Sequence, residues 1–136
     1  MDFFQKLIWD IGESLDLPLH ADENRNCKLI LEEKMAMQLA LSDCDTYVIV
    51  ALFIAEIPPG AFRINVLETA LNENYKSTKL GYFSYSKKYN ALVLENFYEK
   101  IHLHDGKELA NELEKITELG LVWHTAILSG NLHSIG

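Results

Sequence analysis

The sequence predicts an α+β domain with an antiparallel sheet, in the order helix, three strands, helix, two strands, helix. Three observations support this class. Apolar residues recur at helical spacing near both ends, two pairs of alternating stretches each flank a short polar turn, and a Pro-Pro-Gly sequence separates the third strand from a central helix. A length of 136 residues suits one domain, 1–136, with a substantial core.

Composition limits the classes of partner. Twelve basic against twenty acidic residues give a net charge of −8, which repels nucleic-acid phosphates and anionic lipid. We therefore expect no nucleic acid and no membrane as partners, whereas a basic or apolar polypeptide segment is compatible. Cys27 and Cys44 stand far apart, which indicates a reducing compartment and two small core residues. The N-terminal stretch has no basic region followed by an apolar run, so we do not expect it to be a secretory signal, and a cytoplasmic protein is expected.

The first helix begins at an Asp2 cap with Gln5 three residues on, and Leu17-Pro18-Leu19 ends it. Its apolar residues form one face: Phe3, Phe4, Leu7, Ile8, Ile11 and Leu15. Trp9 falls on the opposite, polar face. Two interpretations of Trp9 remain open: a contact for a partner, or a ring folded over a neighbouring loop.

Two alternating stretches, 27–32 and 35–42, predict a β-hairpin around Glu33-Lys34. One face carries small or weakly polar side chains, namely Lys28, Ile30, Ala36, Gln38 and Ala40. A face exposed to solvent normally carries more charge. We therefore treat this face as a candidate binding surface.

The stretch Tyr47–Ala55 is apolar on both faces, which predicts a strand in the middle of the sheet that is covered on each side. A second hairpin is expected from 79–86 and 91–97. Asp105 with Glu108 caps a last helix. Its apolar stripe consists of Leu109, Leu113, Ile116, Gly120, Trp123 and Ile127.

The central helix, Gly60–Tyr75, follows Pro58 and Pro59. Asn65, Glu68, Thr69 and Asn72 share one narrow polar strip. Apolar side chains flank this strip on both sides: Phe62, Val66 and Ala70 on one, and Ile64, Leu67, Leu71 and Tyr75 on the other. A surface helix usually buries one stripe, whereas this one needs two apolar neighbours. We expect its own sheet to be one and a second copy of the chain to be the other, giving a homodimer.

No catalytic motif stands out. The stretch from Asp22 imitates a calcium loop but has Cys27 at the sixth position, where that loop needs glycine. Gly-x-Ser-x-Gly and glycine-rich phosphate loops are absent from the sequence. We therefore expect no enzyme activity, no metal and no cofactor. A small hydrolase or metal enzyme using His102, His104 and a distant carboxylate is kept as an alternative.

Several segments together resemble the Tir-chaperone (CesT/SycE-like) family of class I type III secretion chaperones. The resemblance covers most of the chain, from Phe3 to about Ser129. The carrying segments are Ile11–Leu19 at the end of the first helix, Asn26–Leu29, Ile57–Pro59 leading into Leu67–Asn74, Lys79–Tyr85, Ala91–Leu94, and a last helix containing Trp123. The resemblance implies the α-β-β-β-α-β-β-α fold and a bacterial cytoplasmic homodimer with a role in virulence.

It further implies that the dimer binds the non-globular N-terminal segment of a secreted effector and delivers it to the export machinery, whose ATPase is a further expected partner. By position, the dimer interface would include Phe62, Ile64, Val66, Leu67, Ala70, Leu71, Tyr75 and Tyr82. The effector surface would include Phe4, Ile8, Trp9, Leu17, Leu19, Ile30, Ala36, Gln38 and Ala40. Arg63 and Asn74 interrupt the apolar side of the central helix, which suggests a polar pair in the interface or a tilted dimer. The alternative is a homodimeric regulatory or scaffold module of the same fold that binds a folded partner.

Overall fold

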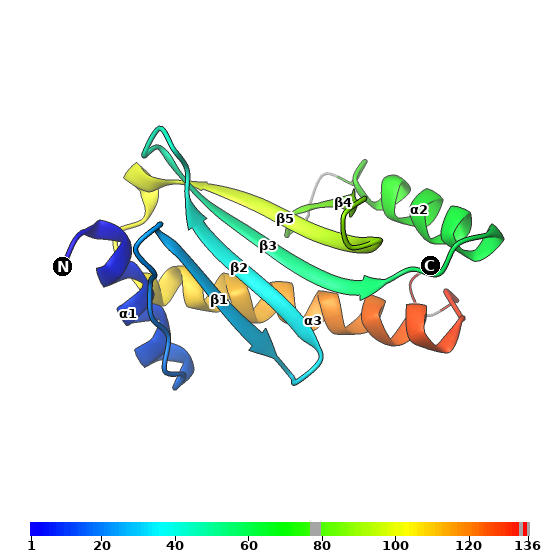
Figure 1. Ribbon diagram of the computed structural model, residues 1–136, viewed down its shortest axis with the longest axis horizontal. Coiled ribbons are helices and arrows are strands. Elements are labelled where there is room, and N and C mark those ends of the chain that lie inside the picture. Colours follow the sequence, from blue (N-terminus) through cyan, green and yellow to red (C-terminus); the bar gives the residue numbers. More distant parts are fainter. Residues whose placement is uncertain (77–79, 134, 136) are drawn as a thin grey trace.

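The computed structural model describes residues 1–76, 80–133 and 135, and Figure 1 shows the arrangement of its elements. In chain order they are α1 (Phe3–Leu15), β1 (Asn26–Leu31), β2 (Met35–Leu41), β3 (Tyr47–Glu56), α2 (Ala61–Glu73), β4 (Tyr82–Ser86), β5 (Ala91–Glu99), a 3-10 turn (Lys100–His102) and α3 (Gly106–Ser129). This order confirms the predicted fold class. Lys79, the predicted start of the second hairpin, lies outside the described residues, and β4 begins at Tyr82.

The five strands form one antiparallel sheet in the order β1-β2-β3-β5-β4. β3 lies in the middle, as its apolar sequence predicts. β1 and β2 are joined by a tight turn in which Glu32 and Glu33 have φ values of 54° and 56°, and Lys34 N–H donates to the Leu31 carbonyl at 3.0 Å. Positive φ at both central residues of a tight turn matches the right-handed twist of the flanking strands, and here residues 32–34 lie between the paired Leu31 and Met35.

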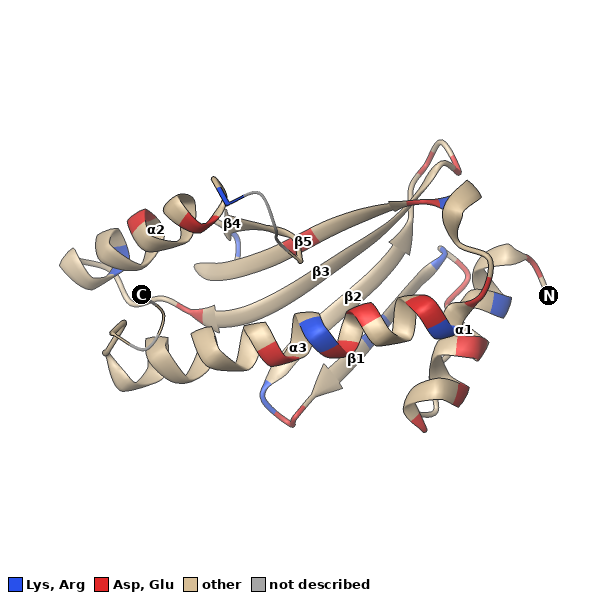
Figure 2. Cartoon of the chain, turned by 180° about the vertical axis from the view of Figure 1, so that it is seen from behind, with Lys and Arg blue, Asp and Glu red and all other residues tan. Residues whose placement is uncertain are grey.

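α3 covers one face of the sheet, with α1 near its N-terminal end and α2 beside β4 at the other end of the molecule (Figures 1 and 2). All six residues of the predicted α3 stripe are buried. Gly120 lets the helix approach closely, because a Cβ there would collide with the Leu52 side chain of β3. The core between α3 and the sheet also contains Leu39, Val50, Leu52, Ile54, Leu92 and Leu94, each at most 1% exposed.

α1 follows the sequence prediction closely. Asp2 and Gln5 form a reciprocal capping box, with Gln5 N–H donating to the Asp2 carboxylate at 2.8 Å. The apolar face packs into the core, and the N-terminal part of α3 packs on this helix. Trp9 stays on the solvent side, 49% exposed.

The sheet face opposite α3, called the outer face below, has no helix over it in the described part of the chain (Figure 1). Along β3, Tyr47 on this face is exposed and the side chains that follow it there are half-buried, whereas those facing α3 are fully buried. The expectation that Tyr47–Ala55 is covered on both sides is therefore wrong for this chain by itself. In the described part of the chain, its outer side chains are sheltered by neighbours on the sheet and, at Phe53, by the Tyr89 ring of the β4–β5 turn.

Two sets of polar contacts fix α2 at the β4 end. The Arg63 guanidinium donates to the Ile57 carbonyl and lies 5.5 Å from the centre of the Tyr85 ring. The Asn74 side chain donates to the Phe83 carbonyl at 3.0 Å and accepts from Phe83 N–H at 2.8 Å, which occupies part of the free edge of β4. These two residues, which interrupt the apolar pattern of α2 in the sequence, thus bind the helix to its own chain.

Candidate binding surfaces

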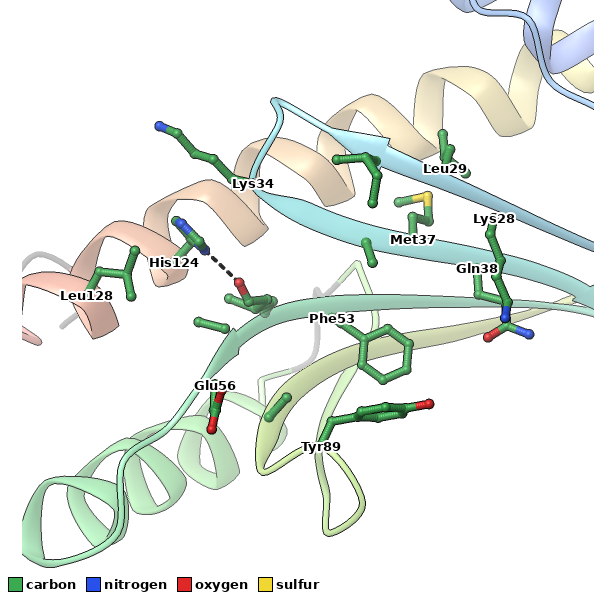
Figure 3. A pocket seen from close by; sticks show the side chains of 15 residues that line it. Lys28, Leu29, Lys34, Met37, Gln38, Phe53, Glu56, Tyr89, His124 and Leu128 are labelled. Carbon is green, nitrogen blue, oxygen red and sulfur yellow. Dashed lines mark hydrogen bonds between the residues drawn. The ribbon is translucent and has the colours of Figure 1, made fainter.

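A broad trough runs from the outer face over the end of the β1–β2 hairpin to the C-terminal part of α3 (Figure 3). It has a volume of about 660 Å³ and is called the outer trough. Its lining residues are Lys28, Leu29, Ile30, Lys34, Ala36, Met37, Gln38, Phe53, Ile54, Ala55, Glu56, Tyr89, Ala91, His124 and Leu128. Most of these side chains are aliphatic or aromatic, so the trough suits apolar side chains of a partner.

Two contacts shape the walls of the outer trough. The Phe53 and Tyr89 rings meet edge to face, with centroids 5.7 Å apart, and Lys88 Nζ lies 5.2 Å from the Tyr89 centroid. At the far end, His124 Nδ1 is 2.6 Å from the Ile54 carbonyl oxygen, which ties α3 to the end of β3 (Figure 3). The aromatic wall therefore comes from the β3 strand and the β4–β5 turn.

A smaller pocket of about 230 Å³ lies where β1, the end of α1 and the middle of α3 meet; it is called the edge pocket. Its residues are Leu15, Leu17, Leu29, Leu31, Glu32, Met37, Leu113, Glu114, Thr117, Glu118 and Leu121. Seven of the eleven are Leu or Met, and all three charged ones are glutamates. The pocket is thus an apolar depression with an acidic rim.

β1 also offers a free edge for pairing. Leu41 N–H donates to the Arg25 carbonyl, and the register then pairs Cys27 with Leu39 and Leu29 with Met37. Because N–H and C=O groups alternate in direction along an antiparallel strand, those of Lys28 and Ile30 point away from β2. Such groups can pair with an added strand. The free edge lies between the two hollows: Lys28 and Ile30 line the trough, Leu31 lines the edge pocket, and Leu29 lines both.

α2 has two apolar stripes with different surroundings. Val66 and Ala70 are buried against the chain's own sheet, and Phe62 next to them is half-buried. On the other stripe, Ile64 and Leu71 are 58% and 59% exposed. Leu67 on that stripe is half-buried, while Tyr75 and the neighbouring Tyr82 of β4 are exposed.

The predicted interface residues therefore divide into two groups. Val66 and Ala70 offer no surface to a second subunit, and the expectation for these two is corrected: they fill the space between α2 and the sheet. The side chains that remain available are Ile64, Leu71, Tyr75 and Tyr82, with Phe62 and Leu67 partly so.

The predicted effector-surface residues divide in the same way. Phe4, Ile8 and Leu19 belong to the core, so their expected place on a surface is corrected. The physical reason is that they lie on the single apolar side of the α1 region, which α3 and the sheet cover. Trp9, Leu17, Ile30 and Ala36 are exposed, and Gln38 and Ala40 are half-buried on the outer face.

Several residues that line the two hollows are not predicted from the sequence. Phe53 and Ala55 of β3 extend the outer face, and the register that pairs Ala36 with Phe53 would have located them. Tyr89 and His124 come from distant parts of the chain, and no spacing in the sequence connects them to β1. Glu114 and Glu118 lie four residues apart on α3, a spacing that places both on one helix face.

Other expectations concern chemistry. Within 1–76, 80–133 and 135, no group of three or more His, Cys, Asp or Glu side chains could hold a metal ion, and no helix is long and apolar enough to cross a membrane. Burial raises the pKa of the Cys27 thiol. Cys44 is exposed, so its expected place in the core is wrong, and hydrogen bonds with Ser42 and Thr46 lower the pKa of its thiol. Its place in the β2–β3 turn, outside both apolar faces, explains the difference.

The fold is similar to those of several solved structures. No curated protein sequence matches the chain. A chain in the structure of the HopA1–SchA chaperone–effector complex is 20% identical, with a TM-score of 0.71 over 91% of this chain and 94% of that one. A chain in the structure of the Yersinia pestis type III secretion chaperone SycH with a stable fragment of YscM2 is 12% identical, with a TM-score of 0.64 over 87% and 97%. A chain of the ExoT–SpcS complex from Pseudomonas aeruginosa is 18% identical, with a TM-score of 0.62 over 86% and 93%.

These likenesses confirm the predicted fold. At the level of sequence, a family model matches residues 6–119, from the first turn of α1 to the middle of α3. That span includes every strand, the free edge of β1, most of the edge pocket and all of α2. The chain belongs to the Tir chaperone protein (CesT) family.

Proposed function

We propose that this chaperone acts in the bacterial cytoplasm as a homodimer and keeps the non-globular N-terminal segment of a type III secretion effector extended and ready for export. The observation that carries the proposal is the outer trough lying beside the free edge of β1. Membership of a chaperone family, and fold likeness to a chain of the HopA1–SchA chaperone–effector complex, support the same function.

The geometry suits an extended segment better than a folded one. Backbone groups of Lys28 and Ile30 can pair with a strand along β1, which satisfies the client's own N–H and C=O groups. Alternate side chains of that strand then point to opposite faces of the sheet. One set can fill the edge pocket while the other extends the apolar outer face toward Phe53. A folded protein could make the same backbone pairing only through an exposed edge strand of its own.

The free energy of such binding allows release. An unfolded segment loses conformational entropy when it becomes ordered, so affinity is moderate for the area that is buried. Most of the contacts available on this chain are apolar side chains and strand hydrogen bonds. Export machinery that pulls the segment away then has no catalytic step or covalent bond to reverse.

The second apolar stripe of α2 supports the dimer. Ile64 and Leu71 lie seven residues apart on one helix face, and Tyr82 of β4 is exposed at the same end of the molecule. Contiguous exposed apolar side chains on a small acidic domain indicate a protein contact. A twofold arrangement would let the same stripe cover itself, and would leave the two β1 edges free for a client.

Co-expression with the effector segment is the direct test. We expect the chain to co-purify with an N-terminal effector segment, and limited proteolysis of the complex to leave a protected extended fragment. Mass spectrometry of the fragment and circular dichroism of the free segment would establish that it is non-globular. A monomeric chain that protects no segment contradicts the proposal; protection of a globular partner instead favours a regulatory or scaffold module.

Trp9 tests how far the client surface extends over α1. Because Trp9 is half-exposed and Ile8 beside it is buried, Trp9→Ala should leave the free energy of unfolding within about 0.5 kcal/mol of the wild-type value. Loss of an aromatic contact in the client surface should weaken binding by roughly tenfold. Fluorescence anisotropy with the labelled effector segment measures this. Unchanged affinity would assign Trp9 to the chain's own surface.

A further inference from the structure

The edge pocket and the outer trough carry opposite charge. Charged residues in the edge pocket are Glu32, Glu114 and Glu118. Those in the outer trough are Lys28, Lys34 and Glu56. The other lining residues of both hollows are mostly apolar, so a client's apolar residues alone would not distinguish them. Their charge does distinguish them. The charged residues of the edge pocket and those of the outer trough lie on opposite sides of the free strand β1.

The spacing of the glutamates matches that of an extended peptide. Glu114 and Glu118 lie four residues apart on α3, which separates their Cβ atoms by about 6 Å. Alternate side chains on one face of a β-strand are about 7 Å apart. In the described part of the chain, no ion pair or hydrogen bond is found for the carboxylates of Glu32, Glu114 or Glu118. Figure 2 shows acidic bands along α3, on the side of the sheet that this helix covers.

A strand added to β1 must present one set of side chains to this rim. Its residues on the α3 side meet Leu31, Leu113 and Leu121 in the pocket and the glutamates around it. Its residues on the other side extend the outer face beside Lys28. An apolar residue that fills the pocket is therefore followed, two positions along the strand, by a residue near a carboxylate.

Resting on the proposed function, we propose that the edge pocket selects client segments with an apolar residue and a Lys or Arg two positions away, both facing α3. The apolar side chain fills the space between Leu31, Leu113 and Leu121. The cation lies at Glu114 or Glu118. The sequence of the segment, and not only its lack of structure, then determines which stretch of an effector pairs with β1.

The expected change in affinity follows from the known strength of solvent-exposed ion pairs. A single pair in solvent changes affinity by roughly two- to fivefold, and added salt reduces it. Replacing two carboxylates with two ammonium groups turns attraction into repulsion. We expect at least about a tenfold loss of affinity for a segment with the favoured cation, and a gain for the same segment with Glu in that place.

Selection from a displayed library of random peptides of about a dozen residues tests the inference with the full chain as bait. Three proteins are compared: the wild type, Glu114→Lys/Glu118→Lys, and a control, Glu23→Lys/Asp43→Lys. The control changes the net charge equally at exposed sites outside both hollows. Circular dichroism and sedimentation establish that all three share one fold and oligomeric state. The most enriched peptide is then labelled and titrated by anisotropy, together with its Lys→Glu version.

The expected result is enrichment of an apolar residue with Lys or Arg two positions away, for the wild type and for the control. The Glu114→Lys/Glu118→Lys protein should instead enrich Asp or Glu at that position. Apolar peptides without charge bias, or the same bias for all three proteins, would overturn this inference and leave the proposed function intact. If no protein enriches any peptide, extended-segment binding itself fails. A change of oligomeric state in the edge-pocket variant would mean that a second copy occupies the pocket.

Discussion

α1 and α2 each contain 13 residues and pack at opposite ends of one sheet, yet they use their apolar residues differently. α1 buries five residues on one side and keeps polar residues on the other, apart from Trp9. α2 buries only Val66 and Ala70 and leaves Ile64 and Leu71 largely exposed. The first helix completes its packing within the chain, whereas the second has an apolar stripe that the chain itself does not cover.

The difference indicates that α1 mainly stabilises the fold of the chain, whereas α2 has an apolar stripe available for association. α1 contributes to protomer stability, because α3 and the sheet enclose its apolar side. α2 contributes less to the core, and hydrogen bonds of Arg63 and Asn74 with backbone groups hold it in place. A helix fixed by hydrogen bonds on one side is free to use its other side for association. Substitutions in the two helices should therefore affect different measurements.

The largest effect is expected from a charge in the α1 core. Ile8→Asp places a carboxylate where Ile8 is 1% exposed, and it removes buried aliphatic surface. A buried unpaired carboxylate costs several kcal/mol, which is a large part of the stability of a small domain. We expect the isolated protein to be largely unfolded, as measured by urea denaturation followed by circular dichroism.

Trp9→Asp is the matched control in the next position of α1. The same carboxylate there stays in solvent, so the free energy of unfolding should fall by no more than about 1 kcal/mol. Equal destabilisation by the two substitutions would mean that the polar side of α1 also packs against the chain.

The next effect concerns association through α2. Leu71→Asp introduces a carboxylate on the exposed stripe, where a second subunit would have to bury it. We expect the dimer dissociation constant to rise by about a hundredfold or more. The folded protomer should persist, because Leu71 is 59% exposed in the chain alone. Sedimentation equilibrium measures the dissociation constant.

Asn72→Asp provides the control for charge, since Asn72 is exposed next to Leu71 but lies on the polar strip of α2. It should change dimerisation only slightly. A Leu71→Asp protein that remains dimeric at micromolar concentration would place the interface elsewhere and remove the dimer role from α2.

Much of the fold could be predicted because its signals are local. The Asp2–Gln5 capping box, the alternation in β1 and β2, and the apolar stripe of α3 each depend on neighbouring residues, and the structure confirms all three. The two-sided character of α2 was also visible from spacing alone. Which of its stripes meets the sheet was not, because periodicity gives the relative positions of side chains and not the direction of the neighbour.

The binding surfaces were harder to predict because they join distant segments. Tyr89, His124 and Lys34 meet at one trough only through the sheet order and the position of α3. The family resemblance implies that apolar residues of α1 lie on a client surface, yet Phe4 and Ile8 are part of the core. A sequence cannot separate these two uses of an apolar side chain when both require the same residue type.

The smallest effect tests how well the α1 end of the molecule excludes water. Burial, together with the nearby Glu112 carboxylate, raises the pKa of Tyr98 to about 12, well above its ordinary value near 10. Between about pH 10 and pH 12, the folded state therefore keeps this phenol neutral while the unfolded state loses the phenol proton. The corresponding stability is present below about pH 10 and is lost as the pH rises towards 12. In a pH titration followed by tyrosinate absorbance, Tyr98→Phe should remove a late phase near pH 12 and flatten the decline in stability above pH 10. A late phase that survives the substitution would mean that another tyrosine is responsible, and that the β5–α3 contact admits more water than its burial indicates.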